Sequence, residues 1–516
     1  MKNAKQAIFV ETYGCQMNVL DSALVADQLA ALGYHLVDDD AEAGVVLLNT
    51  CAVRELSEHK VWSRLGRLGV TKRRGRRVVV GVLGCMAERE GAGIRARMPH
   101  VDIVCGPSNL DRLPSMIHNA LNNGGPQISL AGHTSRRSQT LARSQDKDGI
   151  EALDLSRAFS PVQGRAQAYV RITRGCNKFC SFCVVPFTRG PEVHRPPEHI
   201  VDEVRRLVDT GIVEVTLLGQ TVNHYHHQSG ERTTSFADLL WLVHERVPAL
   251  RRLRFITSYP RDFGDDALDV MAAAPRICRY LHVPAQSGSD RLLRRMNRGY
   301  TREDYLHLVA RARARMPDIC IAGDMITGFP GETESDHAAS LELLQQAQLK
   351  SCFVFKYSPR PGTIAYRRLA DDVPEAVKRA RNVQLLAVQS AISAAHHRAQ
   401  IGTNVELLVE GISKLKKTFA PVCEPEHAAA AQKDHVRLIG RTGGDEIVAF
   451  DGPPHLIGTI TQVAIVGATP LTMSGRWDGG TDDHGEAHGV SESTECTTPQ
   501  TLARRSLPVL QERPRT

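Results

Sequence analysis

Short apolar runs alternate with helical stretches along most of this chain. In the first hundred residues the apolar runs are QAIFVETYG, GVVLLNT, RRVVVGVLG and VDIVCG, and NVLDSALVADQLAALG between the first two has helical spacing. Gly33 ends that helix, whose apolar face carries Leu20, Leu24, Leu29 and Leu32. Strands that alternate with helices form parallel sheets covered by helices. The sequence therefore predicts an N-terminal parallel α/β domain over residues 5–120.

A second alternation of strands and helices follows a polar stretch, residues 121–164, which reads as a linker. Its apolar runs are AYVRITRGC, EVTLLGQ, RLRFITS, RYLHVPAQ, ICIAGDMITG and CFVFKYS. Helical stretches such as PEHIVDEVRRLVDTG lie between them. Six strand–helix units predict a partial (β/α) barrel over residues 165–400, with its chemistry at the carboxyl rim of the strands.

The pattern changes after a long helix expected at about 374–400. The runs VELLVEGISK, HVRLIGRTGGDEIVAF and GTITQVAIVGA are short, rich in β-formers and separated by Gly and Pro. They predict a small C-terminal β-barrel over residues 401–470. Residues 471–516 are polar and lack apolar periodicity, so we expect a disordered tail.

The loop after the first strand of the predicted (β/α) barrel carries three cysteines in a C-x3-C-x2-C pattern. They are Cys176, Cys180 and Cys183, in RGCNKFCSFCVVPFTRG. Three thiolates would leave a bound metal centre with one vacant position, and thiolates are the usual ligands of iron–sulfur clusters. The alternatives are a zinc knuckle completed by a distant His, or thiols unrelated to a metal. The position on the barrel rim favours the cluster.

Three more cysteines follow strands of the predicted N-terminal sheet. Cys15, Cys51 and Cys85 occur in YGC, NTC and LGC. The carboxyl ends of parallel strands share one edge, where open α/β folds bind ligands, so these thiols could meet in space. Cys105, in VCG, is a rival member. Buried cysteines are common in cores, and spacing alone leaves a metal site here open.

Composition narrows the setting of the protein. No apolar run approaches the roughly 20 residues that cross a bilayer, and MKNAKQAIFVETYGC lacks the shape of a signal peptide. We therefore expect a cytosolic protein, in which its 12 cysteines serve as metal ligands or reactive thiols rather than disulfides. The formal net charge of +7 is compatible with a nucleic-acid partner.

Several motifs together resemble the radical S-adenosylmethionine (SAM) methylthiotransferases. They are TYGCQMNVLDS, LNTCAVRE, GCMAER, RGCNKFCSFCVVPFTRG, LLGQTVNHY, PAQSGSDRLLRRMNRGYTREDY, GFPGET and YSPRPGTIAY, in order over residues 7–470. Aromatic Phe182 before the last cysteine belongs to the radical SAM signature. GCQMN and CVVPFTRG look most like the members that act on N6-dimethylallyladenosine in tRNA. The resemblance implies that the C-terminal β-barrel is a TRAM domain that holds RNA.

The resemblance also implies the cofactors and the reaction. Cys176, Cys180 and Cys183 would hold the [4Fe–4S] cluster that binds SAM. A second [4Fe–4S] cluster, which provides sulfur, would be held by Cys15, Cys51 and Cys85. Two SAM molecules, one a methyl donor and one a radical source, would place a methylthio group on carbon 2 of the adenosine beside the anticodon. Further SAM contacts would come from Phe182, Gly219, Gln220, Gln286, Ser287 and Gly328, each of which could equally be an ordinary rim-loop residue.

The implied partners are a tRNA anticodon stem-loop with an isopentenylated adenosine and an electron donor, with no membrane and a monomeric chain. Candidate phosphate contacts are the basic run at 64–77, the lysines of SKLKK, Arg437 and Arg441, although such runs are often merely solvated. Rival substrates are threonylcarbamoyl-adenosine in tRNA and a ribosomal-protein aspartate. A non-catalytic zinc and RNA-binding protein is the rival from another class.

Other cysteines and histidines have weaker claims to a function. HYHHQSG contains His224, His226 and His227, but a polar loop without nearby Cys or carboxylate is a poor metal site, and we reject that interpretation. Cys278, Cys423 and Cys496 look scattered. Cys320 and Cys352 lie in apolar strands, so we expect them in the core.

Overall fold

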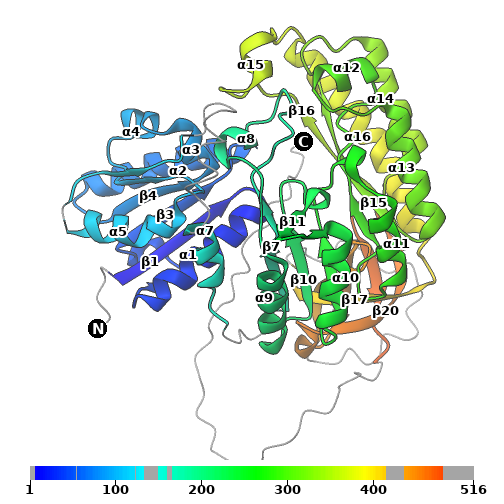
Figure 1. The fold of residues 1–516 in the computed structure, drawn as a ribbon, viewed down its shortest axis with the longest axis horizontal. Helices are drawn as coiled ribbons and strands as arrows, with labels where there is room; N and C mark the ends of the chain where they lie inside the picture. Colours follow the sequence, from blue (N-terminus) through cyan, green and yellow to red (C-terminus); the bar gives the residue numbers. More distant parts are fainter. Residues whose placement is uncertain are drawn as a thin grey trace, which may run out of the picture.

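The computed structural model describes residues 6–53, 55–122, 124–132, 149–159, 166–413 and 435–479. Figure 1 shows the N-terminal sheet domain in blue and cyan, a larger central domain in green and yellow, and a small β-structure in orange. Among the described residues, no helix combines the length and apolar character needed to cross a bilayer. The three parts follow one another in the order that the sequence predicts.

The N-terminal domain is a parallel sheet with the strand order β2-β1-β3-β4-β5-β6. The strands are β1 (Ala7–Tyr13), β2 (His35–Leu36), β3 (Val45–Thr50), β4 (Val79–Gly84), β5 (Ile103–Cys105) and β6 (Gln127–Ser129). One face packs on α1 (Gln16–Ala31) and α5 (Leu113–Leu121). The other packs on α2 (Glu55–Arg73), α3 (Cys85–Glu90) and α4 (Gly93–Arg97). The predicted parallel α/β domain is confirmed.

Two details of this domain differ from expectation. Leu32 follows the last turn of α1 and its side chain is 57% exposed, because the helix has ended before its apolar face would repeat. The stretch 121–164 contains more than a linker, since β6 pairs with β5 and α7 (Gly149–Leu155) packs against the sheet domain. Both elements are short, and their few apolar residues gave no clear periodicity.

The central domain is an incomplete barrel of parallel strands. One sheet has the order β13-β10-β7 and the other β14-β15-β16, and a parallel bridge between Leu253 and Ile277 lies where they adjoin. The six strands predicted from the sequence are β7 (Gln167–Arg171), β10 (Glu214–Leu218), β13 (Arg252–Phe255), β14 (Tyr280–His282), β15 (Cys320–Thr327) and β16 (Ser351–Lys356). The outer helices include α9 (Pro197–Asp209), α10 (Phe236–Arg246), α11 (Asp265–Ala273), α12 (Asp290–Arg295), α13 (Arg302–Arg315), α14 (Glu334–Ala347) and α16 (Glu375–Arg398).

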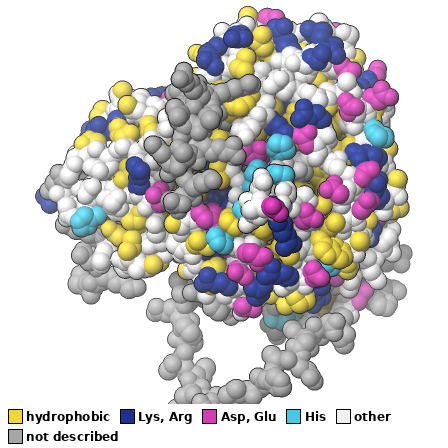
Figure 2. Space-filling model, viewed as in Figure 1, with side chains coloured by type: hydrophobic (Ala, Val, Ile, Leu, Met, Phe, Trp, Pro, Cys, Tyr) yellow, Lys and Arg dark blue, Asp and Glu magenta, His cyan; other side chains and the backbone are white. Residues whose placement is uncertain are grey.

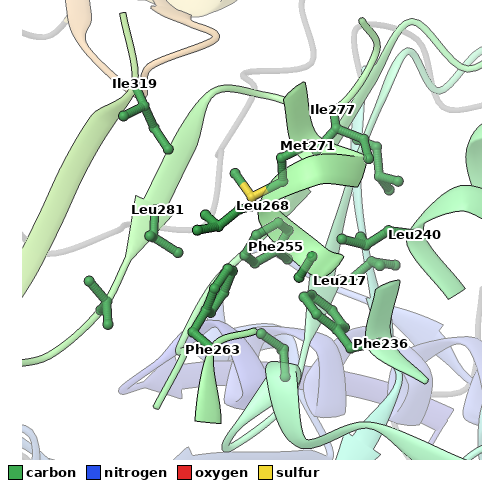
Figure 3. Close-up of a cluster of buried hydrophobic side chains, with 14 of the residues drawn as sticks. Leu217, Phe236, Leu240, Phe255, Phe263, Leu268, Met271, Ile277, Leu281 and Ile319 are labelled. Carbon is green, nitrogen blue, oxygen red and sulfur yellow. The ribbon is translucent and has the colours of Figure 1, made fainter. Parts of the chain in front are cut away.

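The core between these strands and helices is apolar and aromatic (Figure 3). Phe255 on β13 meets Phe236 of α10 edge-to-face, with ring centroids 5.1 Å apart, and stacks on Phe263 at 6.3 Å. Burying one such ring contributes about 2–3 kcal/mol. This packing fixes the positions of the strands. It therefore also fixes the positions of the rim loops, which begin at the carboxyl ends of the strands.

The orange C-terminal part is a closed β-barrel in the order β17-β18-β19-β21-β20. Its strands are β17 (Asn404–Ile412), β18 (Val436–Thr442), β19 (Ile447–Gly452), β20 (Ile460–Ala468) and β21 (Met473–Arg476). The closing strand β21 lies beyond the boundary expected at residue 470. The lysines of SKLKK, the predicted tail from residue 480 onward, Cys423 and Cys496 lie outside the described residues.

The β-barrel covers the amino-terminal ends of the central strands. Arg252 and Arg254, on β13, donate to the carbonyls of Arg441 and Thr442 at 3.0 Å. Lys350, just before β16, donates to the carbonyl of Gly444 at 3.0 Å. The C-terminal domain and the carboxyl rim therefore lie at opposite ends of the central barrel.

Candidate active site: two cysteine triads

The N-terminal sheet brings Cys15, Cys51 and Cys85 together. They follow β1, β3 and β4, which are neighbours in the sheet, so all three reach the same carboxyl edge. A hydrogen bond with Cys51 lowers the pKa of the Cys15 thiol to about 6, and the same pairing raises the pKa of Cys51. Burial raises the pKa of Cys85. These electrostatic couplings place the three thiols at one site.

Glycine is required before two of these cysteines. Gly14 and Gly84 both have positive φ, at 137° and 87°. A Cβ on Gly14 would lie 2.4 Å from the Cβ of Cys51, and one on Gly84 would lie 2.4 Å from Oδ1 of Asn49. Only glycine permits both the backbone turn and the close approach of neighbouring strands. The Gly-Cys pairs in YGC and LGC thus have a structural cause.

The buried side chains of Asn18 and Asn49 form a hydrogen-bond network beside this triad. Cys15 donates from its thiol to Oδ1 of Asn18 at 3.2 Å, and Asn18 donates to Oδ1 of Asn49 at 2.9 Å. Asn49 in turn donates to the carbonyl of Asn18 at 2.9 Å. Both asparagines are fully buried, so the network fixes the turn after β1 relative to β3. No local sequence pattern predicts a role for Asn18 or Asn49, because the two residues are 31 positions apart in the chain.

The central barrel contributes directly to the N-terminal triad. Arg189, at the end of the short helix α8 (Val185–Thr188), donates to the Cys85 sulfur at 3.2 Å and to Asp21 at 2.8 Å. Val184 packs against Ala52 and Cys85. The segment that carries the second triad therefore also covers the first one. No local pattern predicts this role for Arg189, because its partner lies 104 positions away in the chain.

The second triad lies in the loop after β8 (Thr173–Arg174), on the carboxyl rim. Cys176 and Cys180 are buried and Cys183 is partly so. Burial raises the pKa of Cys176 to about 11 and raises that of Cys183 further. Arg298 donates to the Cys180 sulfur at 3.3 Å. The loop therefore gathers three thiols and one cation in an enclosed site.

Aromatic side chains surround the second triad. Tyr259 and Tyr300 pack against Cys180, and Phe182 meets Phe329 edge-to-face at 6.4 Å. These rings exclude water from the cysteine loop and hold it against the neighbouring rim loops. Asn297 donates to the carbonyl of Phe179 at 3.0 Å and so fixes the middle of the loop.

The donor chemistry of both triads fits iron–sulfur clusters better than single zinc ions. Tetrahedral zinc, with bonds of about 2.3 Å, holds its sulfurs about 3.8 Å apart. Within the described ranges, the one group of three metal-binding side chains whose ligand atoms all lie within 4.8 Å of one another contains neither triad. At least one pair of thiols in each triad is therefore farther apart than a single zinc ion allows, and a buried arginine beside each triad offsets the negative charge of thiolate ligands.

The residues expected to contact SAM all follow strands of the central barrel, as a rim site requires. Gln286 has φ +70° and forms a parallel bridge with Met325. Ser287 lies 3.5 Å from Oγ of Ser340, a contact that already explains its burial. Phe182 packs near Cys183, and the loops after β10 and β15 carry Gly219, Gln220 and Gly328. Their role in binding SAM stays a prediction.

Two other groups of candidate ligands, Cys105 and the histidines of HYHHQSG, are not part of the triads. Cys105 packs in the sheet core and donates to the carbonyl of Asn109 at 3.2 Å, and burial raises its pKa. His224 pairs with Glu192 at 2.7 Å, whereas His226 and His227 lie in a hairpin strand, β11 (His226–Ser229). Contrary to the expectation from the sequence, a carboxylate does lie beside His224, and Glu192 pairs with one of its ring nitrogens.

Some of the basic residues that we expected to contact phosphate already pair with acidic side chains. In the basic run at 64–77, Arg64 pairs with Glu11 at 2.9 Å and Lys72 with Asp102 at 2.6 Å, while Arg67, Arg73, Arg74 and Arg77 are exposed. The run ends at the far end of α2, a helix about 28 Å long, so it lies away from the triads. On the face drawn in Figure 2, Lys and Arg lie among Asp and Glu.

The basic residues of the C-terminal barrel are engaged as well. Arg437 lies 3.4 Å from Asp451, and Arg441 lies 3.1 Å from Glu410 and 3.0 Å from Asp445. The two arginine side chains are similarly half-exposed, at 25% and 26%, but Arg437 pairs with the half-exposed Asp451, whereas Arg441 bridges two carboxylates beside the turn after β18. An ion pair of the first kind contributes little and can be exchanged for phosphate. Arg437 is therefore the better candidate for an RNA contact.

The fold and the two cysteine sites define a radical SAM protein with an added N-terminal domain. Residues 170–344 match the radical SAM superfamily, and residues 7–106 match the uncharacterized protein family UPF0004. A tRNA-2-methylthio-N6-dimethylallyladenosine synthase of Rhodopirellula baltica is 42% identical over 477 residues, covering 92% of this chain and 96% of that protein. The counterpart in Porphyromonas gingivalis is 41% identical over 474 residues, covering 91% and 95%. The chain belongs to the tRNA-2-methylthio-N6-dimethylallyladenosine synthase family.

Among solved structures, a radical SAM methyltransferase, TsrM, from Kitasatospora setae is similar with a TM-score of 0.49 and 18% identity, covering 70% of this chain and 75% of that one.

Proposed function

We propose that this protein adds a methylthio group to carbon 2 of N6-dimethylallyladenosine beside the anticodon of tRNA. The observation that carries the proposal is the pairing of two cysteine triads, one on each domain, joined by the segment from Cys176 to Arg189. Family membership gives the substrate class. Two SAM molecules and two [4Fe–4S] clusters, when bound, supply the radical, the methyl group and the sulfur.

The residues of the chain have distinct tasks in this proposal. Cys176, Cys180 and Cys183 hold the SAM-binding cluster, and Cys15, Cys51 and Cys85 hold the second one. Arg298 and Arg189 donate to one sulfur of each set and balance negative charge where water is excluded. The contact of Val184 with Ala52 keeps the two sites facing one another. The substrate base would then lie between the domains.

An apolar surface beside the N-terminal triad suits the dimethylallyl group. Val53 and Leu56 are 55% and 52% exposed, next to Cys51. Glu55, between them in the chain, helps to line a cavity of about 530 Å³ together with Trp62, Arg89 and Arg360, and both arginines pair with Glu58 there. Exposed apolar side chains beside cationic ones could receive a prenyl group and adjacent phosphates. The names of the relatives, rather than this surface, favour the prenylated base over threonylcarbamoyl-adenosine, because the carboxylate of the latter would also suit a site with arginines.

We also propose where the protein acts, its oligomeric state and its partners. We place the enzyme in the cytosol, as a monomer that takes electrons from a separate donor protein. The C-terminal barrel would hold the tRNA, with Arg437 as one phosphate contact.

Single cysteine variants test the assignment of the two triads. Cys176→Ala should abolish both SAM cleavage and thiolation, by at least about 100-fold, because the radical source is lost. Cys51→Ala should keep SAM cleavage and lose thiolation. Cys105→Ala, a buried cysteine at the same sheet edge, is the matched control and should keep both. The measurements are 5′-deoxyadenosine release and mass spectrometry of digested tRNA.

The same assay separates the rival functions. Wild-type thiolation by Cys51→Ala would overturn the second-cluster assignment. Product on threonylcarbamoyl-adenosine tRNA but not on dimethylallyl tRNA would change the substrate. Colourless protein with zinc and no SAM cleavage, after anaerobic cluster reconstitution, would favour the non-catalytic RNA-binding protein.

A further inference from the structure

Three metal-binding side chains meet far from the two triads, where the C-terminal barrel joins the central domain. Cys320 begins β15, His396 lies in the last turns of α16, and Glu446 lies in the turn between β18 and β19. The sulfur of Cys320 is 3.9 Å from Nε2 of His396 and 3.6 Å from Oε1 of Glu446. Nε2 of His396 and Oε1 of Glu446 are 2.7 Å apart. Among the described residues this is the one compact group of its kind.

These separations are close to those that one zinc-like ion would impose. Bonds of about 2.3 Å to sulfur and about 2.0–2.1 Å to nitrogen and oxygen, at tetrahedral angles, separate ligand atoms by about 3.3–3.6 Å. The two distances from Cys320 already lie near this range. His396 and Glu446 would need to move apart by about 0.6 Å, and His396 would need to move about 0.3 Å closer to Cys320. Rotation of their terminal torsions can provide such a shift.

The surroundings hold the ligands in place. Thr442 donates to the other carboxylate oxygen of Glu446 at 2.5 Å, which leaves Oε1 directed at His396 and Cys320. A Cβ on Gly444 would lie 2.5 Å from the Cys320 sulfur, so the turn can approach the thiol only with glycine there. A hydrogen-bond donor that orients a ligating carboxylate is typical of metal sites.

The nearby cation Lys350 is held by groups other than the three proposed ligands. Its ammonium group donates to the carbonyls of Gly444 and Asp445, at 3.0 and 2.6 Å, and lies 3.9 Å from a carboxylate oxygen of Asp445. Cys320 and Glu446 are buried, whereas the side chain of His396 is 29% exposed. An ion could enter past His396, and water could take the fourth position.

We propose that Cys320, His396 and Glu446 bind one zinc-like divalent ion that fastens the C-terminal barrel to the central domain. The ligands come from three elements that are distant in sequence, so the ion would link β15, α16 and the β18–β19 turn. Binding releases the thiol proton of Cys320 to solvent and changes no oxidation state. This inference is independent of the proposed reaction, because the site lies at the opposite end of the barrel from the triads.

The test uses the full-length protein with both iron–sulfur clusters reconstituted. After incubation with zinc chloride and removal of free metal, wild type should hold about one zinc per chain. Cys320→Ala and Glu446→Gln should reduce bound zinc at least about fivefold, with iron content unchanged. Matched controls are Cys352→Ala, a buried cysteine on the adjacent strand, and His397→Asn, next to His396. Both controls should keep the zinc.

X-ray absorption at the zinc edge should show one sulfur at about 2.3 Å and the remaining ligands as nitrogen or oxygen at about 2.0–2.1 Å. Zinc should also raise the unfolding temperature of wild type and not that of Glu446→Gln, a variant that preserves the side-chain shape. Wild type without stoichiometric zinc would overturn the proposal. So would zinc retained by both Cys320→Ala and Glu446→Gln, or a zinc site with several sulfurs, since that ion would be in a triad.

Discussion

Each cysteine triad is paired with one buried arginine that donates to one of its sulfurs. Arg189 lies 3.2 Å from Cys85, and Arg298 lies 3.3 Å from Cys180. Burial alone would lower the pKa of both guanidinium groups, yet Asp21 and Cys85 raise the pKa of Arg189, and Tyr300 and Cys180 raise that of Arg298, so both stay charged. Hydrogen bonds and positive charge at the sulfurs of a cluster stabilise its reduced form.

Removal of the Arg298 charge should therefore make the SAM-site cluster harder to reduce. We expect Arg298→Gln to lower its reduction potential by on the order of 100 mV, because a charge about 5 Å away contributes about 3 kcal/mol at an effective dielectric constant of about 20. Arg298→Lys, which keeps the charge, should shift it less. The measurement is a redox titration followed by electron paramagnetic resonance, in a Cys51→Ala background that isolates this cluster. Equal shifts in both variants would point to packing rather than charge.

At the scale of elements, apolar patterning predicted the long strands and helices and missed the short ones. All six strands of the central barrel were predicted, because each is a compact apolar run. Strands β6 and β21 have three and four residues, too few to display a period. Pairing with β5, β19 and β20 creates them, and such long-range pairing leaves no local signal.

The residues of the candidate site likewise fall into two groups, those that the sequence predicts and those that only the fold reveals. The six triad cysteines could be chosen from motifs and strand ends, since both signals are local. The supporting groups could not, because Arg189, Arg298 and the asparagine network act across more than 30 positions of chain. Cys320 was expected in the core. It is buried as expected, but its neighbours His396 and Glu446 come from elements that only the tertiary fold brings near.

Strand β21 should decide whether the C-terminal barrel closes. Met473 on this strand is fully buried, a contribution of about 2–3 kcal/mol, and Trp477 just after it donates to Thr461 at 3.1 Å. A chain that ends after Pro470 should have a protease-sensitive C-terminal domain and bind tRNA at least about tenfold more weakly, while SAM cleavage persists. A chain that ends after Gly479 is the control. Limited proteolysis and filter binding would measure both effects, and a resistant shorter chain would contradict the expectation.

At the scale of the whole molecule, buried ion pairs join the N-terminal domain to the central barrel. Asp21 of α1 accepts from Arg171 at 3.0 Å and from Arg189 at 2.8 Å, and Arg171 also pairs with Asp154 of α7. Breaking one member of such a network leaves a buried charge unpaired, at a cost of about 3–5 kcal/mol. The two domains are therefore held in one arrangement, which fixes the position of one triad relative to the other.

If the C-terminal barrel binds the tRNA as we propose, its position would make the enzyme sensitive to the length of the RNA stem. That barrel covers the amino ends of the central strands, and the triads lie beyond their carboxyl ends. Strand β15 alone has eight residues, about 26 Å. An RNA that touches both ends must extend at least that far. A loop with only two or three base pairs should thus lose at least about tenfold in kcat/KM, mainly through KM, because the distant phosphate contacts bind substrate and transition state alike. Equal KM values for short and full-length stems would show that the far end is not used. If both ends of the enzyme contact the RNA, the enzyme selects its adenosine by the distance between that base and the stem phosphates, as well as by the base itself.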